Sequence, residues 1–296
     1  MATKSKFLIT GSTGTLGSEI RKRLAAKKTP FRALVHSSEK AAQIAGPGVE
    51  TVVGDFDKPE TLKPALEGME KVFLLSSSDL KQVERESVLA DLAKAAGVRH
   101  VIKLSMMGAA LDSAVSLARW HAQIERHIEG TGMKFTHLRP NYYMQNFLPS
   151  AQGILTRGVF SGSLGGARIS MIDAADIAGV AVRCLTHAGY ENMVYELTGP
   201  EALGLSDVAV QLSRVLKRPI SYVNVPLETS RKSMLSGGMP VWYVDALQDL
   251  MRSFLEGFGS RVTLAVADIT GRSATSFHEF AHRFAELDAH RENKAA

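Results

Sequence analysis

Residues 11–17 read Gly11-Ser12-Thr13-Gly14-Thr15-Leu16-Gly17, and they directly follow the short apolar segment 6–10. An amphipathic segment, residues 15–28, begins inside this glycine-rich loop. Gly11 permits a tight turn, Gly14 lets the backbone approach a diphosphate, and Gly17 allows a helix to pack closely on a strand. The loop N–H groups and the positive end of the following helix suit an anion. The pattern indicates a strand, a phosphate-binding loop and a helix; the alternative is a glycine turn without a ligand.

The first half of the chain repeats this alternation of short apolar and longer amphipathic segments. The apolar segments do not alternate with polar residues, which is typical of strands that helices cover on both faces. Repeated strand–helix units predict a parallel, doubly wound sheet of the Rossmann type, an α/β fold. Strands are expected at 6–10, 31–36, 49–53, 71–76, 100–105 and 134–138, and helices at 15–28, 80–96 and 113–129.

The second half of the chain is less regular, and glycine and proline interrupt it more often. Helices are expected at 176–185, 205–216 and 241–254, and strands at 194–197 and 220–225. We interpret residues 1–150 as a dinucleotide-binding domain and 151–296 as a smaller α/β cap that binds substrate. The strand at 194–197 is a candidate to return to the main sheet.

Composition narrows the class of protein. Hydrophobic residues make up 45% and charged residues 22% of the chain, a normal globular balance that excludes a mainly disordered protein. No apolar run approaches the roughly 18 residues of a membrane span, so no membrane association is expected. The single cysteine, Cys184, excludes an intramolecular disulfide, and we expect a reducing, cytoplasmic setting.

The charge of the chain gives no indication of nucleic-acid binding. The net charge is only +5, and the densest basic cluster lies at residues 21–28. This cluster fits the solvated face and C-terminal end of a helix, where cations complement the helix dipole. We therefore expect no nucleic-acid partner.

The residues after the second strand indicate which dinucleotide fits. A site that prefers NAD has an Asp or Glu about 20 residues after the glycine loop, which binds the ribose hydroxyls. Here that place holds His36, Ser37 and Ser38, with Lys40 beyond, and none of these four side chains is a carboxylate that would repel a 2′-phosphate. NADP(H) is therefore the preferred cofactor and NAD(H) the alternative. In the structural interpretation, these are surface residues at a helix start, with Ser38 as the N-cap.

Further cofactor contacts are expected where other strands end, because open α/β sheets bind ligands at the carboxyl ends of their strands. Asp55 and Phe56 follow the third strand, near the expected adenine edge, although Asp55 also suits a turn in which it bonds its own backbone. The full expected cofactor-binding set is Gly11, Ser12, Thr13, Gly14, Thr15, Leu16, Gly17, His36, Ser37, Lys40, Asp55, Phe56, Ser76, Ser77, Ser105 and Pro140.

With these motifs in place, the sequence resembles the NmrA-like family of atypical short-chain dehydrogenase/reductases. The residues that carry the resemblance are the glycine loop, Gly54-Asp55, Leu138-Arg139-Pro140-Asn141 with Gln145-Asn146, Ile172-Asp173-x-x-Asp176-Ile177-Ala178, Leu197-Thr198-Gly199-Pro200 and Ser276-Phe277-x-x-Phe280. The resemblance implies an NADP-binding fold. Among enzyme members, the chain is most similar to triphenylmethane-dye and quinone reductases, which transfer hydride directly from NADPH without flavin. The family also contains NADP-binding redox sensors that catalyse nothing.

The usual proton relay of short-chain dehydrogenases is missing. That relay is Tyr-x-x-x-Lys, and no tyrosine in this chain has a lysine four residues later. The resemblance places His121 at the lysine position and Leu117 at the tyrosine position. His121 is our candidate catalytic residue, because its pKa can lie near neutrality. The alternative is a structural histidine paired with Glu125, one helical turn further on.

The expected substrate wall is aromatic and rich in thioethers. It comprises Met106, Met107, Asn141, Tyr143 and Trp242, with ordinary cap core as the alternative, above all for Trp242. Such walls suit flat apolar ligands, because methionine adapts its shape. No His or carboxylate set has the spacing of a metal site, so no catalytic metal is expected.

Together these features favour an NADPH-dependent reductase that passes hydride to a flat, conjugated acceptor such as a quinone or a dye. The alternative is a non-catalytic NADP(H) sensor that docks a regulatory protein. A closed apolar cavity beside the nicotinamide would favour the enzyme. The sequence leaves the oligomeric state open between monomer and homodimer.

Overall fold

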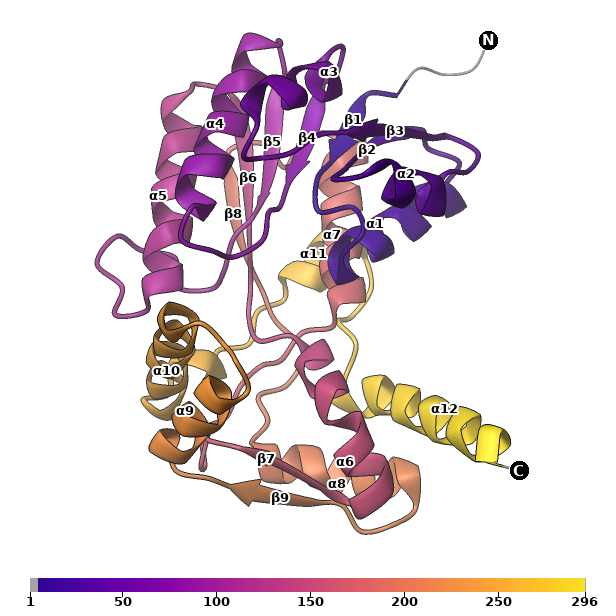
Figure 1. The fold of residues 1–296 in the computed structure, drawn as a ribbon, viewed down its shortest axis with the longest axis vertical. Helices are drawn as coiled ribbons and strands as arrows, with labels where there is room; N and C mark the ends of the chain where they lie inside the picture. The colour runs from indigo at the N-terminus through magenta and orange to yellow at the C-terminus, as the bar shows by residue number, and fades with distance from the viewer. Residues whose placement is uncertain (1–4, 296) are drawn as a thin grey trace.

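A computed structural model describes the backbone of residues 5–295 and the side chains of residues 5–287. Its centre is a seven-stranded sheet in the order β3-β2-β1-β4-β5-β6-β8, and every neighbouring pair is parallel (Figure 1). The predicted doubly wound Rossmann sheet is confirmed. Its strands are β1 (Phe7–Ile9), β2 (Phe31–Val35), β3 (Val49–Val53), β4 (Lys71–Leu74), β5 (His100–Leu104), β6 (Lys134–Pro140) and β8 (Met193–Leu197).

Helices cover both faces of the sheet, as the continuously apolar strands require. One face packs on α3 (Lys63–Leu66), α4 (Gln82–Ala95) and α5 (Ser116–Gly130). The other face packs on α1 (Thr15–Ala26), α7 (Ala174–Thr186) and α11 (Ala265–Thr270). The short helices α2 (Ser38–Ile44) and η1 (Pro59–Leu62) lie in the connections around β3.

The second half of the chain supplies part of this sheet. β8 pairs with β6, with Tyr195 beside Leu138 and Leu197 beside Pro140. The helix before β8, α7, packs against α1, and α11 packs against α7 and β8. The expected return of residues 194–197 to the main sheet therefore takes place, and it draws two helices from beyond residue 150 with it.

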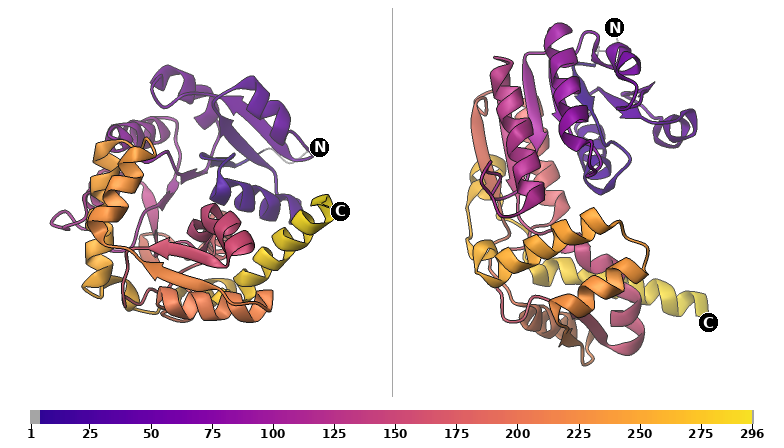
Figure 2. Two further views of the ribbon diagram at one scale, coloured as in Figure 1. Left: turned by 60° about the horizontal axis from the view of Figure 1, so that its bottom comes forward. Right: turned by 60° about the vertical axis from the view of Figure 1, so that its left-hand side comes forward.

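The remaining elements form a second lobe below the carboxyl end of the sheet (Figures 1 and 2). Buried aromatic side chains form much of its core, among them Phe147, Phe160, Phe277, Phe280 and Phe284. Its two strands, β7 (Val159–Gly162) and β9 (Ser221–Asn224), pair in parallel. Its helices are η2 (Met144–Ser150), α6 (Ala151–Arg157), α8 (Leu205–Leu216), α9 (Leu227–Ser236), α10 (Val241–Leu255), η3 (Phe258–Ser260) and α12 (Phe277–Ala295).

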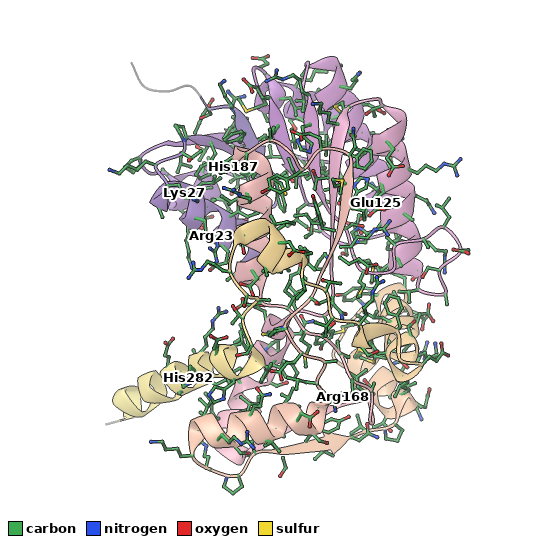
Figure 3. The ribbon with its side chains drawn as sticks, turned by 180° about the vertical axis from the view of Figure 1, so that it is seen from behind. Arg23, Lys27, Glu125, Arg168, His187 and His282 are labelled. Atoms are coloured by element: carbon green, nitrogen blue, oxygen red, sulfur yellow. The ribbon has the colours of Figure 1, made fainter. Side chains whose placement is uncertain are left out.

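The basic cluster of residues 21–28 lies on the second half of α1 and just beyond its C-terminal end. Figure 3 shows Arg23 on this helix and Lys27 at its end, near His187, which follows α7. Lys22, Lys27 and Lys28 are exposed, as the helix-face interpretation expects. In the described part of the chain, no helix combines the length and apolar character needed to cross a bilayer.

Candidate active site between the sheet and the cap

The three glycines of the loop have different geometries. Gly11 has a φ of +58°, and a Cβ on Gly17 would lie 2.1 Å from the Gly11 carbonyl oxygen. These two residues therefore shape the turn itself. Gly14 has an ordinary extended backbone (φ −76°), and a Cβ there would meet only the Gly11 oxygen, at 3.5 Å. The space in front of Gly14 is open.

A cavity of about 400 Å³ lies in front of this loop. Helix α1 begins directly after Gly14, with no side-chain cap and no acidic residue in its first turn. Its first N–H groups are therefore left for an anion, as a dinucleotide diphosphate requires. The expected cofactor residues that line this cavity are Gly11, Ser12, Thr13, Gly14, His36, Phe56, Ser76 and Ser77.

Six of the expected cofactor residues do not line this cavity. They also do not line a second cavity, which lies next to it beneath the cap. Ser37 is the N-cap of α2 and accepts from the Lys40 N–H at 3.2 Å, so the N-cap is Ser37 rather than Ser38. The Lys40 ammonium donates to Gln43. Asp55 accepts the Asp57 N–H at 2.9 Å, which is the self-bonded turn that we gave as its alternative. Thr15, Leu16 and Gly17 form the first turn of α1.

A second cavity of about 260 Å³ lies beneath the ends of β4, β5 and β6. Leu75 and Ser76 border both cavities, so the two are neighbours. The cap borders the second cavity mostly with apolar side chains, namely Leu247, Leu250 and Phe254 from α10 and Phe258 from η3, together with the polar Asn146 from η2. These four apolar residues could not be predicted from the sequence, because nothing local indicates which face of α10 meets the sheet.

Several expected site residues border this second cavity. They are Ser105, Met106, Met107, His121, Pro140, Asn141 and Tyr143. The Ser105 hydroxyl is buried and has no hydrogen-bond partner among the described residues. Such an orphaned polar atom at a cavity wall suits a ligand. Burial raises the pKa of Tyr143, so its phenol stays protonated.

Two of the expected substrate residues have contacts that hold the structure together. The Asn141 amide donates to Ser170 Oγ at 2.8 Å and to the Gly259 carbonyl at 2.9 Å. These hydrogen bonds join the end of β6 to the cap, although Asn141 also borders the cavity. Trp242 lies outside the cavity lining, and its ring packs on Trp120 with centroids 5.7 Å apart. Trp242 is half-buried in this contact between α10 and α5, outside the buried core of the cap.

The pairing that we considered between His121 and Glu125 is wrong. Glu125 accepts from Arg139 Nε at 3.0 Å. His121 instead contacts Lys103 of β5, with Nζ and Nδ1 3.2 Å apart. Burial, and then the Lys103 charge, hold the pKa of His121 well below its ordinary value.

Lys103 belongs to a buried ionic group that sequence analysis missed. Its ammonium lies 2.7 Å from Glu86 Oε2, and both side chains have an exposed fraction of 0%. A lysine inside an otherwise apolar strand was the available signal, since buried charges need a partner. Among the residues that the structure describes, no three His, Cys, Asp or Glu side chains are placed to hold a metal ion.

The fold and the two adjoining cavities define a dinucleotide-binding protein of the Rossmann class. The NmrA-like family model matches residues 3–280, and the chain belongs to this family. It is 40% identical over 275 residues to the NAD(P)H azoreductase of Xenophilus azovorans, covering 93% of this chain and 96% of the relative.

Two solved structures show the same arrangement over nearly the whole chain. The NADPH-dependent quinone oxidoreductase of Escherichia coli, solved with NADPH, superposes with a TM-score of 0.86 at 30% identity, covering 94% of this chain and 99% of that one. The triphenylmethane reductase of a Citrobacter species, solved with NADP(H), gives 0.85 at 25% identity, with coverage of 94% and 99%.

Proposed function

We propose that this protein is an NADPH-dependent reductase that delivers hydride directly, without flavin, to a flat conjugated acceptor such as a quinone or a cationic dye. The observation that carries the proposal is the pair of neighbouring cavities that share Leu75 and Ser76. One has the polar glycine loop of a diphosphate site, and the other has an apolar wall. The names of the azo-dye, quinone and triphenylmethane reductases similar to this chain support the same class of acceptor.

The residues around the first cavity fit a dinucleotide. The open space at Gly14 and the uncapped start of α1 would hold the diphosphate, and His36 would lie near the ribose. The orphaned Ser105 hydroxyl would meet the nicotinamide end. When bound, the reduced cofactor would supply the hydride that the acceptor takes up.

The second cavity would hold the acceptor and exclude water. Met106, Met107, Tyr143, Phe254 and Phe258 all line it, and such a lining suits a planar, apolar molecule. A conjugated acceptor of this kind takes hydride without an obligatory acid, which agrees with the missing Tyr-x-x-x-Lys relay. Catalysis would rest chiefly on holding the two reactants close together.

The same cavity favours an enzyme over a redox sensor. A sensor needs no space for a second small molecule beside the cofactor. Here four apolar cap residues, from α10 and η3, line a cavity at the ends of the sheet strands that has room for one.

Steady-state oxidation of NADPH with a panel of quinones and cationic dyes tests the proposal. The protein should be freed of any flavin first, and turnover should persist without added flavin. Acceptor-dependent turnover that does not exceed the protein-free rate would contradict the reductase and leave the sensor.

A carboxylate at residue 36 should weaken the preference for NADPH over NADH. His36→Asp places a carboxylate at the wall where a 2′-phosphate would lie, and the repulsion should raise the NADPH dissociation constant at least about tenfold. The NADH dissociation constant should change much less. Isothermal titration of both nucleotides measures the two values.

His36→Asn is the matched control, since it has the shape of the aspartate without its charge. Lys40→Met should also leave the preference for NADPH unchanged, because Lys40 lies outside the cavity lining. Tighter binding of NADH than NADPH by the unaltered protein would contradict the preference.

A further inference from the structure

The buried group behind the second cavity has a definite hydrogen-bond pattern. Glu86 Oε1 accepts from the Ser76 hydroxyl at 2.8 Å, the Ser76 N–H at 3.3 Å and the Gln82 amide at 3.2 Å. Its other oxygen lies against Lys103. An environment made only of donors stabilises the carboxylate form, and a buried carboxylate needs a cation beside it. Lys103 is that cation.

An ammonium group has three hydrogens to donate and nothing that accepts. The Lys103 ammonium forms an ion pair with Glu86 and hydrogen bonds with the Leu104 carbonyl oxygen and with His121 Nδ1. Nδ1 must therefore accept, so the His121 ring is neutral and carries its proton on Nε2. Among the described residues, none bonds Nε2, and His121 lines the second cavity.

We propose that Lys103, anchored by Glu86, is a positioning residue that locks His121 in the neutral Nε2–H tautomer, as a hydrogen-bond donor for an acceptor oxygen in the second cavity. The acceptor's part in this rests on the function proposed above; the tautomer does not. A neutral imidazole donates a hydrogen bond to a developing negative charge, as an electrophile, and does not act as an imidazolium acid.

The charged and titratable groups around His121 agree with this state. On its own helix, Glu125 is neutralised by Arg139 of β6. Tyr143, after β6, stays protonated because burial raises its pKa. The cap side chains that line the cavity are uncharged. The nearest charge to the ring is the Lys103 ammonium, which opposes a second proton.

The direct test is the ¹⁵N NMR spectrum of His121 in the protein without ligands, recorded between pH 8 and pH 5. We expect Nε2 protonated and Nδ1 unprotonated throughout, because the pKa of His121 is held well below 6.5. Glu86→Gln/Lys103→Met removes both charges of the buried pair and leaves neither unpaired. In this variant the titration midpoint should rise by about one pH unit or more.

Glu125→Gln/Arg139→Met is the matched control. It removes the ion pair one turn along α5, which does not contact Nδ1, and it should leave the His121 signals as they were. The proposal is wrong if the protein holds His121 with a proton on Nδ1. It is also wrong if neutralising Lys103 and Glu86 in a folded variant leaves the midpoint unmoved.

Kinetics provide the second readout. Glu86→Gln/Lys103→Met should lower kcat with a quinone about tenfold, the value of one lost hydrogen bond to a charged group, and leave the NADPH dissociation constant within about twofold. His121→Ala should cause a similar loss. In the His121→Ala background, the double substitution should have no further effect on kcat, because both act through one group.

A merely structural role would give additive losses, and that result would overturn the proposal. If no acceptor is turned over by any form of the protein, the proposed function fails, but the NMR result still decides the tautomer. The two conclusions therefore fail separately.

Discussion

Gly14→Val should abolish measurable NADPH binding, with a rise in the dissociation constant of at least about 100-fold, equivalent to roughly 2.7 kcal/mol. The branched side chain would occupy the open space that we assign to the diphosphate. The fold should survive, because Gly14 has an ordinary extended backbone and a Cβ there meets only the Gly11 oxygen, at 3.5 Å. Fluorescence titration with NADPH measures the loss, and the melting temperature reports on the fold.

Gly46→Val is the matched control. Gly46 lies in a loop, its φ is not positive, and a Cβ there would have no atom within 4 Å, so valine should leave NADPH binding intact. Unchanged NADPH affinity in a folded Gly14→Val variant would show that the diphosphate does not bind at this loop.

Asp173→Ala should destabilise the protein by about 3 kcal/mol, the combined cost of a lost helix cap and of buried donors without partners. Asp173 has an exposed fraction of 0% and caps α7 through the Ala175 N–H, at 2.9 Å. It also accepts from the Gln145 amide at 2.7 Å and from Arg283 of α12 at 2.5 Å. One carboxylate thus joins the sheet to the cap. Urea unfolding measures the change.

Asp207→Ala provides the comparison for a helix-cap carboxylate at the surface. Asp207 accepts the Gly204 N–H at the start of α8 and pairs with the exposed Arg168 at 3.0 Å. This substitution should lower the free energy of unfolding by no more than about 1 kcal/mol, since exposed ion pairs contribute little to stability. Equal losses at the two positions would refute the buried, two-lobe role of Asp173.

The sheet could be predicted because each βα unit is encoded locally. The apolar strands and the glycine loop indicate a parallel sheet without any knowledge of tertiary contacts. The return of residues 194–197 to this sheet could also be predicted from the sequence. The cap was harder to predict. Elements such as α6, β7 and α9 are short, and their packing around Phe147 and Phe277 joins segments far apart in the sequence.

The residues of the candidate site were also predictable only in part. The rule that ligands meet the carboxyl ends of strands placed His36, Phe56 and Ser105 correctly at cavity walls. The rule does not specify side-chain direction, and Asp55 accepts a hydrogen bond from the nearby Asp57 N–H. The contact between Lys103 and His121 joins a strand to a neighbouring helix, and no spacing in the sequence encodes it.

Transfer of deuterium from NADPH labelled at C4 to a cationic triphenylmethane dye tests the central claim most directly. Hydride that passes directly between the two molecules stays on the central carbon of the colourless product, where it does not exchange with water. We predict that one of the two C4-deuterated epimers of NADPH yields a product labelled at that carbon, with flavin-free protein. Unlabelled product from both epimers, or no product above the protein-free rate, would contradict direct hydride transfer.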